Sequence, residues 1–182
     1  MTLEELRALP KEDVIALLEV CRKGMRFQDG FWFMNVEDAL GLDRAVDMDA
    51  DIWTRFGKYE AQLLLKTFKW ATKGIPGLVK AIHYAPSWLF FERLVEQVSD
   101  TEATFQVSKC LAQASRLKTG RTLFACRKVE EGYLGSFAKA IDENIRVVRN
   151  FGPPDSHRDN VWCSWRFYVE AGPANKPLSS VH

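Results

Sequence analysis

In the first half of the chain, apolar residues recur every three or four positions, which is the spacing of one helix face. Thr2 and Glu5 form a capping-box pattern, so we expect a short helix that ends near Pro10. A second helix follows and should end at Gly24, because glycine commonly terminates helices. Its apolar residues share one face: Val14, Leu17, Leu18 and Cys21.

The next helix contains the run FWFM, residues 31–34. Consecutive positions point in different directions around a helix, so this run predicts a helix that is buried nearly all round. Glu37 follows in the same helix, where it must lie at a wet edge, pair with an arginine or line a pocket. An edge or an arginine partner is the commoner situation for a glutamate. We carry forward the hypothesis that Glu37 faces an internal cavity, where burial would raise its pKa toward neutrality.

Two more helices are predicted before the pattern changes. Asp43 begins a long helix, which we expect to bend within residues 47–51 and to stop before Gly74. A short helix then includes Pro76 in its first turn and ends before Pro86.

From Trp88 onward the apolar and polar residues alternate with a period of two, which is typical of β-strands. The pattern predicts strands within residues 88–99 and 103–110, a helix over 122–141, and strands within 144–151 and 160–170. We therefore expect an α+β fold: a helical N-terminal half, then a β-β-α-β-β unit with an antiparallel sheet. Residues 1–170 should form one domain and residues 171–182 a flexible tail.

The overall composition excludes several classes of function. The 182 residues carry a net charge of +1, so no strong positive field attracts nucleic acid or an anionic membrane. No stretch has about 18 consecutive apolar residues, and the first residues lack the apolar segment of a secretory signal. The four cysteines are too few for a disulfide scaffold, so we expect a cytoplasmic protein with reduced thiols.

Three of the cysteines, with one histidine, form a candidate metal site in the C-terminal half. Cys110, Cys126, His157 and Cys163 have the right chemistry for zinc. No pair has the short C-x-x-C spacing that makes a zinc site specific, so core thiols are favoured over ligands. If the site exists, at least two of the three sulfurs should lie within ~8 Å of each other.

A basic segment, RLKTGRT, precedes the helix predicted over residues 122–141. It holds Arg116, Lys118 and Arg121, close to the free N–H groups at the start of that helix. This combination suits a carboxylate or a phosphate. A solvated loop is the simpler interpretation, and the residues alone favour it.

Three blocks of the sequence resemble a group of bacterial and archaeal proteins related to the L-2-amino-thiazoline-4-carboxylate hydrolase family. The first block is GFWFMNVEDALGLDRAVDMDADIW, the second KCLAQASRLKTGRTLFACRKV and the third VWCSWRF. The matched positions are Trp32, Val36, Glu37, Gly41, Ala45, Asp49, Trp53, Cys110, Arg116, Gly120, Phe124, Cys126, Cys163 and Trp165. The C-terminal half also looks like the small-molecule-binding domains of the four-vinyl-reductase type, whose cysteines can hold metal.

The resemblance implies a pocket for a small carboxylic acid and, if the protein is an enzyme, hydrolysis of a cyclic carbon–nitrogen bond. Cys126 or Cys110 would then be nucleophile or ligand, and Glu37 the general acid–base. Arg116 would anchor the carboxylate beside Lys118 and Arg121, and Trp32 would form a wall. Arg149, Asn150 and Gly152 stand where many relatives have a further cysteine, which weakens the case for a shared metal site.

Two alternatives stay open from the sequence. The same pocket would serve a non-catalytic sensor or carrier, and the cysteines would serve a structural zinc module. The expected partner is a small-molecule ligand; zinc is the candidate cofactor, and a homodimer is left open.

Overall fold

The computed structural model describes residues 1–155 and 160–170. The tail predicted over residues 171–182 lies outside them. Along the chain the elements are α1 (Leu3–Ala8), α2 (Lys11–Leu40), α3 (Leu42–Phe68), α4 (Gly74–Tyr84), the 3₁₀ segment η1 (Pro86–Phe90), β1 (Glu92–Ser99), β2 (Glu102–Lys109), α5 (Leu111–Lys118), α6 (Arg127–Ile141), β3 (Ile145–Phe151) and β4 (Cys163–Val169). The predicted α+β class, with helices in the N-terminal half and strands after them, is confirmed.

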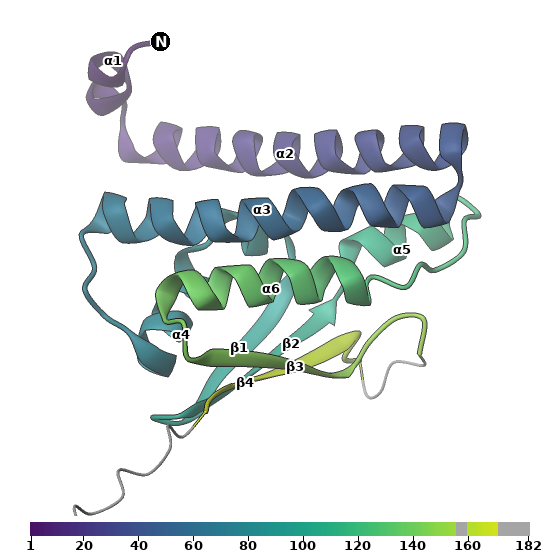
Figure 1. Cartoon of the computed structure of the whole chain (residues 1–182). Coiled ribbons are helices and arrows are strands. Elements are labelled where there is room, and N and C mark those ends of the chain that lie inside the picture. Colours follow the sequence, from purple (N-terminus) through teal and green to yellow (C-terminus); the bar gives the residue numbers. More distant parts are fainter. Residues whose placement is uncertain (156–159, 171–182) are drawn as a thin grey trace, which may run out of the picture.

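The four strands form one antiparallel sheet in the order β1-β2-β4-β3. Figure 1 shows the elements in layers: α6 lies on the sheet, α3 lies on α6, and α2 lies outermost. The alternation predicted for the last strand is confirmed, because Cys163, Trp165 and Phe167 are all buried. No helix in residues 1–155 and 160–170 is long and apolar enough to cross a membrane.

The closest packing in the helical layers is between α3 and α6. A Cβ atom on Gly57 of α3 would lie 2.5 Å from the backbone oxygen of Tyr133 and 2.6 Å from Ser136 Oγ. A Cβ atom on Gly132 of α6 would lie 2.0 Å from Thr54 Oγ1. Only the absence of a side chain at both glycines lets the two helices approach this closely.

Several predicted boundaries are wrong. Gly24 does not end a helix, since α2 runs through it for 30 residues; a glycine inside a helix costs only about 0.5–1 kcal/mol relative to alanine. Residues 47–51 lie inside the uninterrupted helix α3. The chain near Trp88 is 3₁₀ helix and the first strand begins at Glu92, because Pro86 starts a helical turn.

Helix α2 is not buried all round. Phe33 is buried, whereas Phe31 is 57% and Trp32 is 42% exposed. The reason is the position of α2 in the outermost layer, where only one of its sides meets protein (Figure 1). Its attachment is a small apolar cluster separate from the main core, formed by Phe33, Ala45, Ala50, Phe124 and Val129.

The helix predicted over residues 122–141 starts later than expected, at Arg127, with Cys126 as its N-cap residue. Part of the basic segment is itself helical, since α5 extends to Lys118. The free N–H groups of α6 therefore follow Cys126 and not the basic residues.

Replacing Gly57 by alanine should destabilise the protein by about 1–3 kcal/mol, because the new methyl group would force α3 and α6 apart. Gly24→Ala is the matched control, since no atom lies within 4 Å of its missing Cβ. It should stabilise the protein by about 0.5–1 kcal/mol. Urea unfolding curves measure both changes, and equal effects of the two substitutions would contradict the packing argument.

Candidate functional site

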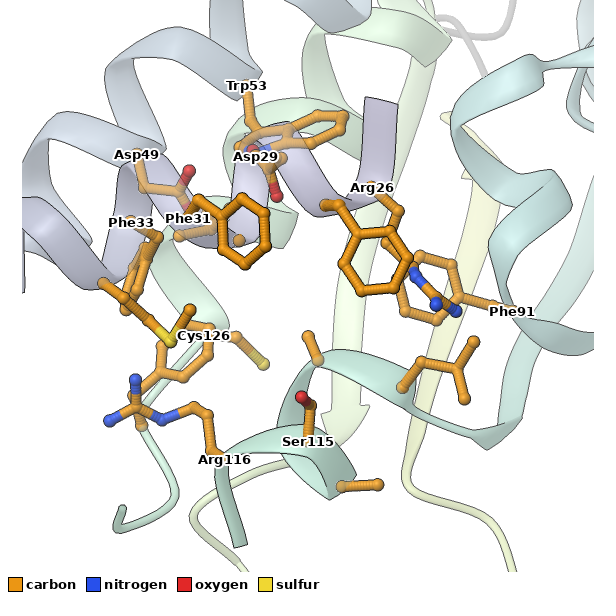
Figure 2. A pocket seen from close by; sticks show the side chains of 18 of the residues that line it. Arg26, Asp29, Phe31, Phe33, Asp49, Trp53, Phe91, Ser115, Arg116 and Cys126 are labelled. Carbon is orange, nitrogen blue, oxygen red and sulfur yellow. The ribbon is translucent and has the colours of Figure 1, made fainter. Parts of the chain in front are cut away.

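A cavity of about 460 Å³ lies between α2, α3, α5, α6 and η1. Figure 2 shows the open space, with side chains of α2 and α3 on one side and those of α5 on the other. Most of its wall is apolar. Eight aromatic residues line it: Phe27, Phe31, Phe33, Trp53, Trp88, Phe91, Phe124 and Tyr133.

Three carboxyl groups from three helices reach this cavity. Asp29 comes from α2, Asp49 from α3 and Glu130 from α6. Figure 2 shows Asp29 and Asp49 projecting into the open space beside Trp53. Asp49 is only 6% exposed, whereas Asp29 is an exposed residue at the edge of the cavity. Glu130 is enclosed by protein, so the surface that it retains belongs to the cavity wall.

Local helix geometry explains how each acid comes to face the cavity. Residues four apart lie on the same face of a helix. Asp29 and Phe33 are four apart, and so are Asp49 and Trp53, and Cys126 and Glu130. Each acid therefore lies on the same helix face as an apolar or thiol side chain that lines the cavity.

The pKa values of the three carboxyls are raised. Burial raises the pKa of Asp29 to about 6, against a smaller opposing effect of a hydrogen bond with Trp53. Burial and the neighbouring charge of Asp29 raise the pKa of Asp49 to about 7. Burial, followed by the charges of Asp49 and Asp29, raises the pKa of Glu130 to about 8. Near pH 7 Glu130 is therefore mostly protonated, Asp49 partly protonated and Asp29 mostly ionised.

A hydrogen-bond network forms one part of the wall. The hydroxyls of Ser87 and Tyr133 donate to Glu60 Oε2 over 2.7 Å and 2.5 Å, and the backbone N–H of Ser87 donates to Oε1 over 3.0 Å. Glu60 is 3% exposed, so three donors satisfy a buried carboxylate. Burial, then the charge of Glu60, raises the pKa of the Tyr133 hydroxyl well above its usual value. The network fixes both hydroxyls at the cavity wall.

Arg116 does not offer a free guanidinium to a ligand. Its Nη1 and Nη2 donate to the two oxygens of Glu37 over 2.6 Å and 2.8 Å, and its Nε donates to the backbone oxygen of Thr122 over 2.8 Å. The guanidinium also lies over the rings of Phe33 and Phe124. Arg116 is 6% exposed, and this bidentate pair joins α5 to α2.

Glu37 has the arginine partner that was one of its three alternatives. The hydrogen bonds from Arg116 hold its pKa below the usual value, against a smaller opposing effect of burial. Its side chain is 14% exposed, so it does not face bulk water, but Arg116 and not Glu37 lines the cavity. An ionised, paired carboxylate is a poor proton donor, which weighs against the general acid–base role expected for Glu37.

The other predicted binding residues are divided between the pocket and the surface. Lys118 lines the cavity. Arg121 pairs with Glu37 over 2.9 Å and with Asp38 over 2.8 Å, outside the lining. Trp32 is not a wall residue, because the inner side of α2 presents Phe31 and Phe33 to the cavity instead.

Cys110, Cys126 and Cys163 lie close enough for the charge of one thiolate to raise the pKa of another. Burial raises the pKa of Cys110 to about 11 and that of Cys163 to about 12, and it raises the pKa of Cys126 further. All three groups are therefore protonated thiols near neutral pH, whereas a cysteine nucleophile must be a thiolate.

The zinc hypothesis gains no support from the part of the chain that the structure describes. Within it, no three His, Cys, Asp or Glu residues are arranged to hold a metal ion. His157, the fourth predicted ligand, lies outside the described residues. The zinc site stays a prediction.

The sequence reasoning missed the three cavity carboxyls. Asp49 was matched in the resemblance only as part of a block, and Asp29 and Glu130 were not singled out. A detectable signal was present, since each acid is four residues from a side chain expected in a core. What no local pattern shows is that the three helices bring these acids together.

Stability should fall as the pH rises from about 4 to about 8. Asp49 and Glu130 have higher pKa values in the folded chain than the ordinary values of 3.8 and 4.5, so the folded state binds more protons in this window. The free energy of unfolding should therefore be lower at pH 8 than at pH 5, by on the order of 2 kcal/mol. Urea unfolding at a series of pH values measures it.

Asp49→Asn and Glu130→Gln should each flatten this pH dependence. Glu131→Gln is the matched control, since Glu131 pairs with Arg127 on the same helix and does not line the cavity. A stability that is constant or rises over this pH range in the unaltered protein would contradict the assignment of buried, protonated carboxyls.

Comparison with known proteins gives a family and no function. Neither the curated proteins nor the solved structures yielded a match to this chain. The resemblances to the thiazoline hydrolase and four-vinyl-reductase families therefore stay predictions. One family model matches residues 7–169, which include every element from α2 to β4. The chain belongs to the family of unknown function DUF6125.

Proposed function

We propose that this protein binds a small organic molecule in the cavity between α2, α3, α5 and α6. The observation that carries the proposal is the cavity itself: about 460 Å³, lined mainly by aromatic and apolar side chains, with a few converging polar groups. Pockets of this size and composition are typical of small-molecule sites. Its wall is supported by the hydrogen-bonded Glu60 network on one side and the Arg116–Glu37 pair on another.

A ligand carboxylate, which the sequence led us to expect, would be held at the pocket mouth. Because Arg116 is already paired with Glu37, we assign the role of carboxylate anchor to the other cations in the lining, Arg26 and Lys118. Among the described residues neither of these two has an ion-pair partner; Arg26 lies over the ring of Phe27. Figure 2 shows the Arg26 side chain extending from α2 toward the Phe91 side of the cavity.

We assign binding to this pocket and no chemical step. Protonated thiols and an ionised Glu37 leave the expected nucleophiles and the expected acid–base group in the wrong protonation states for hydrolysis at neutral pH. A sensor or carrier of a small molecule needs neither. The four free cysteines fit a reducing compartment, so we place the protein in the cytoplasm.

A neutral probe with a small aromatic body tests the pocket. We expect 3-phenylpropan-1-ol to shift NMR signals of cavity-lining residues in a saturable way, because the rings provide an apolar site. Ala112→Trp should abolish these shifts by filling the cavity from α5. Leu117→Trp is the matched control, since Leu117 is 53% exposed on the same helix and outside the lining.

Shifts that persist in Ala112→Trp, or that are equally lost in Leu117→Trp, would place the probe elsewhere and refute the pocket. The absence of any saturable shift in the unaltered protein would refute it as well. Circular dichroism of both variants confirms that they are folded.

The carboxylate analogue of this alcohol, 3-phenylpropionate, tests whether cations at the mouth of the cavity bind a ligand carboxylate. We expect 3-phenylpropionate to bind more tightly than the alcohol, and Lys118→Gln or Arg26→Gln to remove about 1 kcal/mol of that advantage. Lys128→Gln is the control, because Lys128 pairs with Asp47 outside the lining. Isothermal titration calorimetry measures the affinities. Equal binding of acid and alcohol would contradict the cationic anchor.

A further inference from the structure

The cavity is lined by three carboxyls that form no ion pair with any cation in residues 1–155 and 160–170. We propose that Asp29, Asp49 and Glu130 form a subsite for a protonated amine of the bound molecule, with its apolar body against the aromatic wall. This inference rests on the proposed small-molecule pocket and names the chemical group that its inner end recognises. It does not require the ligand to carry a carboxylate.

Glu130 is the observation that points to a ligand. Its side chain is enclosed by protein, lines the cavity and has no hydrogen bond or ion pair with any residue in the described ranges 1–155 and 160–170. An unpaired polar group in such a place costs free energy that a bound donor would recover. Asp49, 6% exposed beside it, is contacted by the indole of Trp53. Trp53 is thus the one donor to these carboxyls among the described residues, and Glu130 has none.

Within the described part of the chain, the charged groups that act on Glu130 come from α2 and α3 and both are acids. Asp29 of α2 and Asp49 of α3 raise its pKa by their negative charge. The thiols of Cys110, Cys126 and Cys163 surround it, and their own pKa values are raised by its charge. Arg116, the buried cation of the lining, is committed to Glu37. An incoming cation would therefore be the first positive charge at these carboxyls.

An organic ammonium fits this site better than a metal ion. Among the described residues no set of three carboxylate, thiol or imidazole groups has metal-binding geometry. The carboxyls are instead accompanied by the rings of Trp53, Phe31 and Phe33, and aromatic faces attract organic cations. A primary ammonium has three N–H donors that it can offer to these acceptors.

Binding of a cation should release protons. Near pH 7 Glu130 is mostly protonated and Asp49 partly so, because their pKa values are about 8 and 7, whereas Asp29, with a pKa of about 6, is mostly ionised. A bound ammonium stabilises the ionised form, so its affinity should rise between pH 6 and pH 8. A neutral ligand of the same shape would show no such dependence.

The test compares 3-phenylpropan-1-amine with 3-phenylpropan-1-ol, which share one apolar body. By titration calorimetry on the full chain at pH 7.5, the amine should bind at least about tenfold more tightly. Its binding should release protons, seen as heats that differ between phosphate and Tris buffers. Glu130→Gln should remove the preference for the amine and reduce the proton release, because it lowers the affinity for the amine far more than the affinity for the alcohol.

Glu131→Gln is the control and should change neither probe, since Glu131 is paired with Arg127 outside the cavity. Asp49→Asn is the second variant, with the same expected loss, in case Glu130→Gln does not fold. Tight binding of the amine that survives both Glu130→Gln and Asp49→Asn would overturn the subsite.

The remaining outcomes separate the subsite from the pocket. If the alcohol binds in the cavity and the amine binds no better, the subsite is refuted and the small-molecule pocket stands. If neither probe binds, both are refuted. If Mg²⁺ or Zn²⁺ binds competitively with the amine and is lost in Glu130→Gln, the site belongs to a metal ion and the inference fails.

Discussion

The close contact between α3 and α6 determines where the functional groups of this protein lie. Gly57 and Gly132 remove the side chains that would hold the two helices apart. At that spacing Glu60 of α3 reaches the Tyr133 hydroxyl of α6, and Asp49 lies near enough to Glu130 to raise its pKa. A single packing constraint therefore creates both a satisfied buried carboxylate and an unsatisfied one.

These two carboxylates, one on α3 and one on α6, differ in their hydrogen-bond partners. The difference indicates a structural role for the first and a binding role for the second. Glu60 accepts hydrogen bonds from Ser87 and Tyr133 and needs nothing further. Glu130 lies beside a cavity and has no such donors in the described chain. Proteins normally pair buried acids, so an acid left unpaired next to empty space is where a binding role is expected.

Local patterns in the sequence were sufficient wherever the determining contacts are local. The Thr2–Glu5 capping box forms as predicted, and the alternation of Cys163, Trp165 and Phe167 places these side chains in the core. Prediction failed where distant segments decide the outcome. The exposure of Trp32 depends on the layer that α2 occupies, and the Glu37–Arg116 pair joins residues 79 positions apart.

The candidate site was harder to predict than the fold for the same reason. Its acids come from α2, α3 and α6, and each looks ordinary in its own helix. The basic residues attracted attention because they are clustered along the chain, yet Arg116 and Arg121 are paired with Glu37 and Asp38 of α2. The sequence pattern drew attention to basic residues that are close together along the chain. The fold instead brings together acidic residues that are far apart along it.

The Arg116–Glu37 pair also gives the cavity a direction. It joins α5 to the C-terminal part of α2, and the rings of Phe33 and Phe124, tilted by 38° to each other, lie beside it. Figure 2 shows Arg26 and Phe91 on the opposite side of the open space from Arg116. On the Glu37 side, α2 and α5 therefore cannot separate without breaking a buried, bidentate ion pair.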